Sequence, residues 1–223
     1  MNQLGEAFSF AFRDKAWVSK FIIGAVFMLL CILIVGIFIL AGYFVQVTQR
    51  VMRKDPNPLP DWDDIGVKLV VGFKFCVVYL IYSLPIIILY VPFIVMTVLS
   101  GMAGGDDGAG FFAGMFGIGF MFLIIPYTLA LYMLLPIITY RFAERESIGD
   151  ALDIAAIVKD FKRNWANTLI VALIAVGIQY FAMVGIVFFL VGVFFTIMYA
   201  YLVSSFMFGA LYLERPQEGI VVT

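Results

Sequence analysis

Residues 75–105 read FCVVYLIYSLPIIILYVPFIVMTVLSGMAGG, without one Asp, Glu, Lys or Arg. A helix needs roughly 20 consecutive apolar residues to cross a hydrocarbon core of about 30 Å. Three more charge-free runs lie at residues 21–49, 108–140 and 164–213. Each run can cross at least once, and the last is long enough to cross twice. A soluble domain would need polar side chains on the outer face of every helix. The sequence therefore predicts an all-α integral membrane protein.

Composition supports this fold class and narrows the function. The chain is 64% hydrophobic and 13% charged, whereas soluble domains are about half apolar and about a quarter charged. Its net charge of −1 offers no basic face for phosphates, so we expect no nucleic-acid partner. The chain has no histidine, the commonest ligand of zinc and the usual general base. We therefore expect a protein that is not an enzyme and has no cofactor and no metal site.

Basic residues indicate which loops face the cytoplasm. Lysine and arginine cluster at residues 13–20, 50–74 and 141–163, and a glycine-rich loop at 101–110 has none. The positive-inside rule places the three basic clusters in the cytoplasm and the glycine-rich loop outside. We therefore expect a multi-pass protein of the cell (inner) membrane with both termini in the cytoplasm.

The first charge-free run conflicts with a single crossing, because basic residues flank both of its ends. One interpretation is a re-entrant hairpin over residues 18–52, with limbs 18–34 and 38–52 that separate at Gly36 or Gly42. Glycine weakens a helix interior, and re-entrant backbone is tolerated where other helices bury it. The other interpretation is one long span. About four full spans follow, in helical hairpins over 61–143 and 165–213, the second turning near 185–192.

Two amphipathic segments, residues 2–13 and 147–163, precede hairpins and are predicted as interfacial helices. The alternative is that each packs on protein. Ser147 and Asp150 have the spacing of a helix-capping pair. Asp153 and Asp160 are predicted on the polar face. The apolar stripes are Leu4, Phe8, Ala11 and Phe12 in the first segment, and Ile148, Ala151, Leu152, Ala155 and Val158 in the second.

Two further patterns concern packing and depth in the membrane. The tryptophans Trp17, Trp62 and Trp165 stand at or just before hairpin starts, which predicts interfacial anchors, since tryptophan prefers the headgroup level. A stripe of small residues lets another helix backbone approach closely. We favour a partner within the chain over another copy. The stripe consists of Gly110, Ala113, Gly114 and Gly117.

The most specific element of the chain is Leu59-Pro60-Asp61-Trp62-Asp63-Asp64, whose aspartates also suit the positive end of a following helix. Further elements are Gly42-Tyr43 leading to Arg50, Gly72-Phe73-Lys74, Tyr82-Ser83-Leu84-Pro85, and Tyr201-Leu202-Val203-Ser204-Ser205 with Gly209. In these elements nearly the whole chain resembles a family known as domain of unknown function 4013. Phe206 departs from it, where a more polar residue is expected. The resemblance implies a multi-span prokaryotic membrane protein and supplies no activity and no catalytic residue.

The expected function is that of a non-catalytic accessory or scaffolding subunit of a membrane assembly, or of a homo-oligomer. Its partners are then membrane lipids and other membrane subunits or copies of itself. The charge-free runs disfavour a proton relay, which needs acids or bases inside the membrane. The alternative is a transporter or channel for a small neutral or lipid-like solute. It is motivated by the hairpin, by a weak repeat of residues 4–7 in 148–151, and by the prolines Pro85, Pro92, Pro126 and Pro136.

Overall fold

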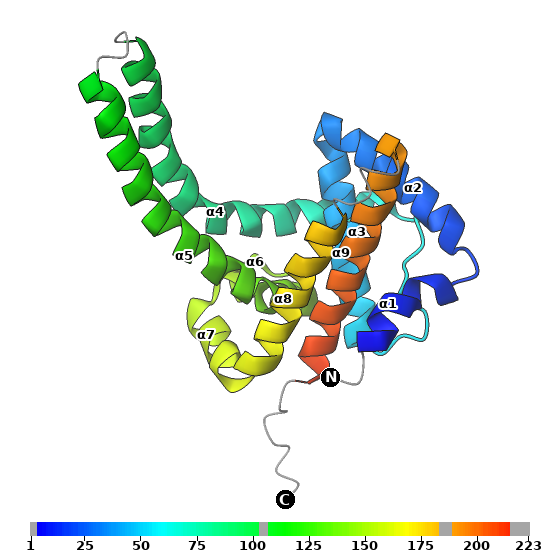
Figure 1. The fold of residues 1–223 in the computed structure, drawn as a ribbon. Coiled ribbons are helices and arrows are strands. Elements are labelled where there is room, and N and C mark those ends of the chain that lie inside the picture. Colours follow the sequence, from blue (N-terminus) through cyan, green and yellow to red (C-terminus); the bar gives the residue numbers. More distant parts are fainter. Residues whose placement is uncertain (1–3, 103–106, 183–188, 215–223) are drawn as a thin grey trace, which may run out of the picture. The chain divides into compact units, whose positions relative to one another are not determined.

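The computed structural model describes residues 4–102, 107–182 and 189–214, and the regular structure within these ranges is helical (Figure 1). The helices are α1 (Leu4–Arg13), α2 (Trp17–Leu29), the 3-10 turn η1 (Leu30–Leu33), α3 (Val35–Met52), α4 (Ile65–Met102), α5 (Asp107–Arg145), α6 (Ile148–Leu152), α7 (Ile154–Arg163), α8 (Trp165–Ala182) and α9 (Phe189–Leu213). Five stretches are long and apolar enough to cross a membrane: Val35–Met52, Ile65–Leu99, Gly117–Arg145, Trp165–Ala182 and Gly192–Leu213. The all-helical, membrane-compatible fold is thus confirmed, and the number of crossings stays a prediction.

The chain divides into two compact units. The bundle unit comprises Met1–Val78 and Met133–Thr223, and the hairpin unit comprises Tyr79–Tyr132. Helices α4 and α5 contribute residues to both units, and the other helices belong to the bundle unit.

Helices α3 and α9 form the centre of the bundle unit and lie side by side. The Phe44 ring stacks on Tyr201 with centroids 5.0 Å apart, and the Thr48 hydroxyl donates to the Ser205 carbonyl at 3.0 Å. These contacts advance in the same direction along both helices, so the two helices run parallel. Gly209 permits the approach, because a Cβ there would stand 2.7 Å from the Thr48 carbonyl oxygen.

Helix α3 also crosses the first part of α4, and a glycine on each helix makes the crossing close. A Cβ at Gly42 would overlap the Lys68 backbone, and a Cβ at Gly72 would overlap the Phe38 carbonyl. Beside them the Phe38 and Phe73 rings meet edge to face at 5.4 Å. Gly42 was offered as a helix break, and that expectation is wrong: it lies inside α3 and serves close packing.

The first charge-free run folds as two helices. Helix α2 ends at Leu29, and η1 with Ile34, whose φ is 64°, reverses the chain into α3. The break therefore comes before Gly36, which lies in α3, where a Cβ would press on the backbone of Leu30 and Cys31. The predicted limbs are close to the observed helices, and the path of this hairpin through a membrane stays a prediction.

The predicted helix over residues 147–163 is two helices, because Asp153 interrupts it. The Asp153 carboxylate accepts from the Ala156 N–H at 3.0 Å and caps α7, a local hydrogen bond that competes with a continuous helix. The predicted cap before α6 is confirmed, since the Ser147 hydroxyl accepts from the Asp150 N–H at 3.3 Å.

The new start at Asp153 changes which face of α7 turns inward. Ile157 and Asp160 are buried, whereas Val158 of the predicted stripe is exposed. Asp160 was expected on the polar outer face, and this expectation is wrong. A period read across one uninterrupted helix loses its phase at a break.

The inward face of α1 also differs from the predicted stripe. Ala7, Phe10 and Ala11 are buried, whereas Phe8 and Phe12 are exposed. The reason is packing on α9, where the Phe10 ring lies 4.7 Å from that of Phe206. One face of helix α1 therefore packs on protein, and a second face exposes Phe8 and Phe12.

The hairpin unit consists of the second part of α4 and the first part of α5. The Phe93 and Phe120 rings stack across the two helices at 4.9 Å, and the Tyr127 hydroxyl donates to the Tyr82 carbonyl at 2.7 Å. The predicted loop over 101–110 is shorter than expected, because α4 runs to Met102 and α5 begins at Asp107. Residues 103–106 of that loop, and 183–188 at the other predicted turn, lie outside the described ranges.

Candidate functional site

The segment between α3 and α4, residues 53–64, is here named the motif loop. Its Trp62 ring stacks on Tyr43 at 4.1 Å and on Phe27 at 4.9 Å. The indole N–H donates to the Lys20 carbonyl of α2 at 2.9 Å. Trp62 therefore lies between α2 and α3 and holds the motif loop against both helices. Its expected role as an anchor at the membrane interface stays a prediction.

Lys20 of α2 is the buried centre of an ionic cluster with Asp14, which is also buried, and Asp61, whose side chain is 60% exposed. Its ammonium lies 2.6 Å from an Asp14 carboxylate oxygen, 2.8 Å from an Asp61 carboxylate oxygen and 3.1 Å from the Leu59 carbonyl oxygen. The Lys20 side chain is 8% exposed. A lysine has three N–H donors, and these three acceptors match them in number. Burial of the charge is tolerated because its hydrogen bonds are made.

Backbone carbonyls of the motif loop accept hydrogen bonds from further side chains of the cluster. The Leu59 carbonyl accepts a second hydrogen bond from Arg50 at 3.3 Å, and Arg50 also donates to the Asn57 carbonyl at 3.2 Å. The Tyr43 hydroxyl donates to the Pro60 carbonyl at 3.1 Å. Side chains of α2 and α3 therefore fix the motif loop through its main chain. The residues Asp14, Lys20, Tyr43, Arg50, Asp61 and Trp62 are named the loop anchor.

The charges of the loop anchor stabilise one another. Burial by itself would raise the pKa of Asp14, but several neighbours lower it. The Lys20 ammonium and the Ala16 N–H donate hydrogen bonds to its carboxylate, and Arg50 adds a further positive charge. The pKa of Asp14 therefore lies below its ordinary value of 3.8. Asp14 stays ionised at neutral pH, as its partner Lys20 requires.

The last two aspartates of the family element prepare the start of α4. Asp64 has a φ of 48°, and its carbonyl accepts from the Val67 and Lys68 N–H groups at 2.9 and 3.2 Å. The Lys68 ammonium donates to the Asp63 carbonyl. Both aspartates precede Ile65, the first residue of α4, so their carboxylates stand just ahead of the helix, near its positive end.

A second polar cluster joins α5, α7 and α9. The buried Asp160 accepts from Arg141 at 3.0 Å and from the Tyr140 hydroxyl at 3.1 Å. The Tyr212 hydroxyl donates to Glu144 at 3.0 Å. These contacts tie the end of α5 to α7 and to the end of α9.

Gln49 connects the central helix α3 to this second cluster. Its side-chain amide donates to the Ala143 carbonyl at 3.0 Å and to Glu146 at 2.9 Å. The C-terminal ends of α3, α5 and α9 therefore meet at one end of the bundle unit, which we name the charged end.

The remaining predicted site residues are not part of the loop anchor. Trp165 is 59% exposed, whereas Trp17 is half-buried, with its ring edge-on to Phe12 and Phe21. An interfacial role for both tryptophans stays a prediction. In the small-residue stripe, Gly117 faces the Phe93 ring at 3.4 Å, and nothing lies within 4 Å of a Cβ at Gly114.

The surroundings of Gly110 and Ala113 fall outside what the structure describes. Close packing along this stripe therefore also stays a prediction.

Sequence reasoning missed the acidic partners that bury Lys20. Lys20 was grouped with the basic residues at 13–20, which were predicted to face the cytoplasm, and Asp14 was not singled out. One signal could have found them: Lys20 directly adjoins the charge-free run at residue 21 and follows Asp14 by six positions, so the two can meet near a helix start.

A model of a protein family, described as protein of unknown function DUF4013, matches residues 25–195. The chain belongs to this family. No curated protein and no solved structure matches the chain. The DUF4013 match includes Tyr43, Arg50 and the motif loop, and it begins after Asp14 and Lys20. The matched region therefore contains the motif loop and the α3 residues of the loop anchor, and it does not contain Asp14 and Lys20.

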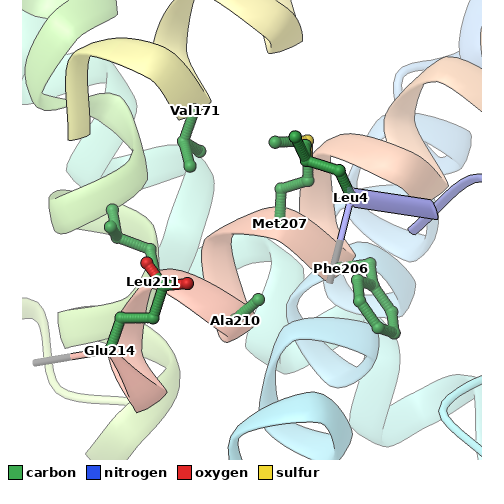
Figure 2. A pocket seen from close by; sticks show the side chains of 7 residues that line it. All are labelled: Leu4, Val171, Phe206, Met207, Ala210, Leu211 and Glu214. Carbon is green, nitrogen blue, oxygen red and sulfur yellow. The ribbon is translucent and has the colours of Figure 1, made fainter. Parts of the chain in front are cut away.

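A small hollow lies between α1, α8 and α9 (Figure 2). Its volume is about 20 Å³, which is room for about one water molecule. Phe206, which departs from the family resemblance, forms part of its wall and is buried. The lining residues are Leu4, Val171, Phe206, Met207, Ala210, Leu211 and Glu214, of which only the last is charged.

Proposed function

We propose that this DUF4013 member is a non-catalytic protein of a prokaryotic cell membrane, with both termini in the cytoplasm. It serves as an accessory or scaffolding subunit, in a larger membrane assembly or as a homo-oligomer. The observation that carries the proposal is that the buried charged side chains of the loop anchor bind the protein's own chain.

General acid–base catalysis needs a titratable side chain within hydrogen-bond reach of a substrate. Lys20 spends its three donors on Asp14, Asp61 and Leu59. Asp14 is likewise buried and bonded to Lys20 and to the Ala16 N–H. These groups bind one segment of the chain to another, which supports a structural role.

The hollow in Figure 2 supports the same reading by its size and its walls. Small-molecule sites usually enclose about 300–1,000 Å³ and contain a few convergent polar groups. The hollow has about 20 Å³, and six of its seven lining residues are apolar. It fits a packing defect between three helices better than a substrate site.

The hairpin unit offers a surface to lipid and to other membrane helices. Its two helices expose large apolar side chains, among them Ile88 and Phe122. The hydroxyls of Ser83 and Thr97 donate to carbonyls one turn earlier in α4, both at 2.8 Å. These two hydroxyls are thus satisfied within the helix, as contact with hydrocarbon requires. Membrane helices associate by close packing, so this unit is the proposed contact surface for a second subunit.

The test is a native mass measurement after extraction in a mild detergent. The chain alone has a mass of 24.9 kDa, and we expect a larger protein complex. The variant Phe122→Ala should reduce the yield of that complex. The matched control is Leu173→Ala, an exposed apolar residue of α8, which should leave the yield unchanged. A monodisperse monomer for the native protein contradicts the proposal.

The alternative function is a path for a small neutral or lipid-like solute. Its support is the pair of prolines, Pro85 and Pro92, inside α4, because a proline frees a carbonyl in a helix. The Tyr127 hydroxyl reaches the Tyr82 carbonyl, one turn before Pro85, and so occupies polar groups that a solute would use. Solute uptake by vesicles containing the pure protein, absent from vesicles without protein, would favour this alternative over the scaffold.

A further inference from the structure

We infer that α2 and α3 form a re-entrant membrane hairpin whose apolar tip, residues 29–35, lies among lipid acyl chains. Both limbs enter from the charged end, and the tip stops short of the opposite aqueous phase. The inference rests on three independent features of the hairpin and does not depend on the accessory role.

The two ends of the hairpin are held close together, on the same side of the membrane. Lys20, near the start of α2, and Arg50, near the end of α3, donate to the same carbonyl, that of Leu59, at 3.1 and 3.3 Å. The ends of a run that crosses once are about 30 Å apart, the thickness of the hydrocarbon core. One carbonyl oxygen cannot bridge that distance, so the chain must enter and return.

Measured from the charged residues Lys20 and Arg50, the limbs end short of the other side of the membrane. At a rise of about 1.5 Å per residue, α3 extends about 22 Å from Arg50 to Val35. The other limb, from Lys20 through η1, has about the same reach. With the charged residues at the headgroup boundary, the tip ends several ångströms inside a hydrocarbon core of about 30 Å.

The tip has the chemistry of a lipid-exposed turn. Residues 29–35 read LLCILIV, and Leu33 and Ile34 are 66% and 62% exposed. Water would make this exposure costly, at about 25 cal/mol per Å² of apolar surface. Two hydrogen bonds close the turn, from the Ile34 N–H to the Cys31 carbonyl at 2.9 Å and from the Ile37 N–H to the Ile34 carbonyl at 3.0 Å. Backbone inside a membrane needs such internal partners, because lipid offers none.

The experiment uses a fluorescent thiol label at the tip, in the full chain reconstituted into phosphatidylcholine vesicles. The first variant carries Cys76→Ala alone, so that the label attaches to the native Cys31. The second carries Cys31→Ala, Cys76→Ala and Ile34→Cys. The control replaces Asn57, an exposed residue of the motif loop, with cysteine in the same cysteine-free background.

We expect lipids with a nitroxide near the acyl-chain terminus to quench both tip labels more strongly than lipids with a nitroxide at the headgroup. The Asn57→Cys label should show the opposite order. An impermeant maleimide should react with Asn57→Cys from one side and with Ile34→Cys from neither. Reaction of Ile34→Cys from the side opposite to Asn57→Cys overturns the inference, because the hairpin then crosses. Tip labels that no nitroxide lipid quenches also overturn it, because protein then covers the tip.

Discussion

At the scale of single residues, few of the described charged side chains are buried, and their placement is specific. An unpaired charge inside a protein costs several kcal/mol or shifts its pKa until it is neutral. Lys20 avoids this cost by pairing with Asp14 and Asp61 and by donating to Leu59. The benefit goes to the motif loop, which has no regular structure of its own and is held in place by these contacts.

Replacing Lys20 should therefore harm the fold more than replacing an exposed lysine. Lys20→Met leaves Asp14 buried without its cation, and removal of one partner from a buried ion pair costs about 3–5 kcal/mol. We expect a clearly lower melting temperature in mild detergent, measured by following tryptophan fluorescence during heating. The control is Lys15→Met, an exposed position five residues earlier, which should change stability little. Equal melting temperatures for the two variants would contradict the loop anchor.

Adding Asp14→Leu to Lys20→Met tests whether the buried charge causes the loss. The double variant removes the uncompensated carboxylate, so it should recover part of the stability. A double variant less stable than Lys20→Met alone would indicate that packing, and not charge, accounts for the effect.

Acid should weaken the same contact in a defined pH range. The pKa of Asp14 is below its ordinary value of 3.8 in the folded protein. Its carboxylate therefore adds stability above pH 3.8, and the protein loses this contribution as the pH falls through the lowered pKa. Asp14→Asn lacks the carboxylate at every pH. The stability gap between native protein and Asp14→Asn should be constant near neutral pH and should shrink below pH 3.8. A gap that does not shrink there contradicts the shift.

Some residues were predictable from the sequence and others were not. The cap at Ser147 was, because it depends on spacing within one turn. The burial of Asp160 and the stacking of Trp62 on Tyr43 were not, since both depend on segments brought together by the fold. The family resemblance marked Tyr43, Arg50 and Trp62 as a set, but a resemblance carries no geometry.

At the scale of helices, the membrane-compatible stretches could be predicted because a run without charges is informative wherever it packs. The inward face of each amphipathic helix was harder. Asp153 divides the predicted helix, and α1 turns Phe10 toward α9 and leaves Phe8 exposed. Hydrophobic period cannot choose between two apolar faces of a helix, because the neighbouring helix makes that choice.

The crossing of α3 and α4 gives a sharp prediction for two glycines of the same helix. A methyl group at Gly72 would overlap the Phe38 carbonyl, whereas a Cβ at Gly66 has nothing within 4 Å. Gly72→Ala should therefore destabilise the protein by about 1–3 kcal/mol, as overpacking does. Gly66→Ala should be neutral or stabilise by up to about 1 kcal/mol, because alanine favours a helix. Thermal unfolding of both variants checks the prediction, and a stable Gly72→Ala would mean that the helices are farther apart.

At the scale of the whole molecule, charge and apolar surface are separated along the chain. The C-terminal ends of α3, α5 and α9 meet at the charged end, with the loop anchor on α2 and α3. The charge-free stretches lead away from it in the sequence, and the glycine-rich segment at 101–110 has no basic residue. The sidedness predicted from the basic residues and the contacts in the bundle unit are therefore mutually consistent.

Two-sided cysteine labelling tests this arrangement most directly. Single cysteines at Asn57, Arg145 and Gly101, all exposed, are introduced into the cysteine-free chain. Each is probed with an impermeant maleimide in intact cells and in inverted vesicles. The account predicts that Asn57→Cys and Arg145→Cys react only from the cytoplasmic side and that Gly101→Cys reacts only from the outside. Reaction of Gly101→Cys from the same side as Asn57→Cys would contradict the account.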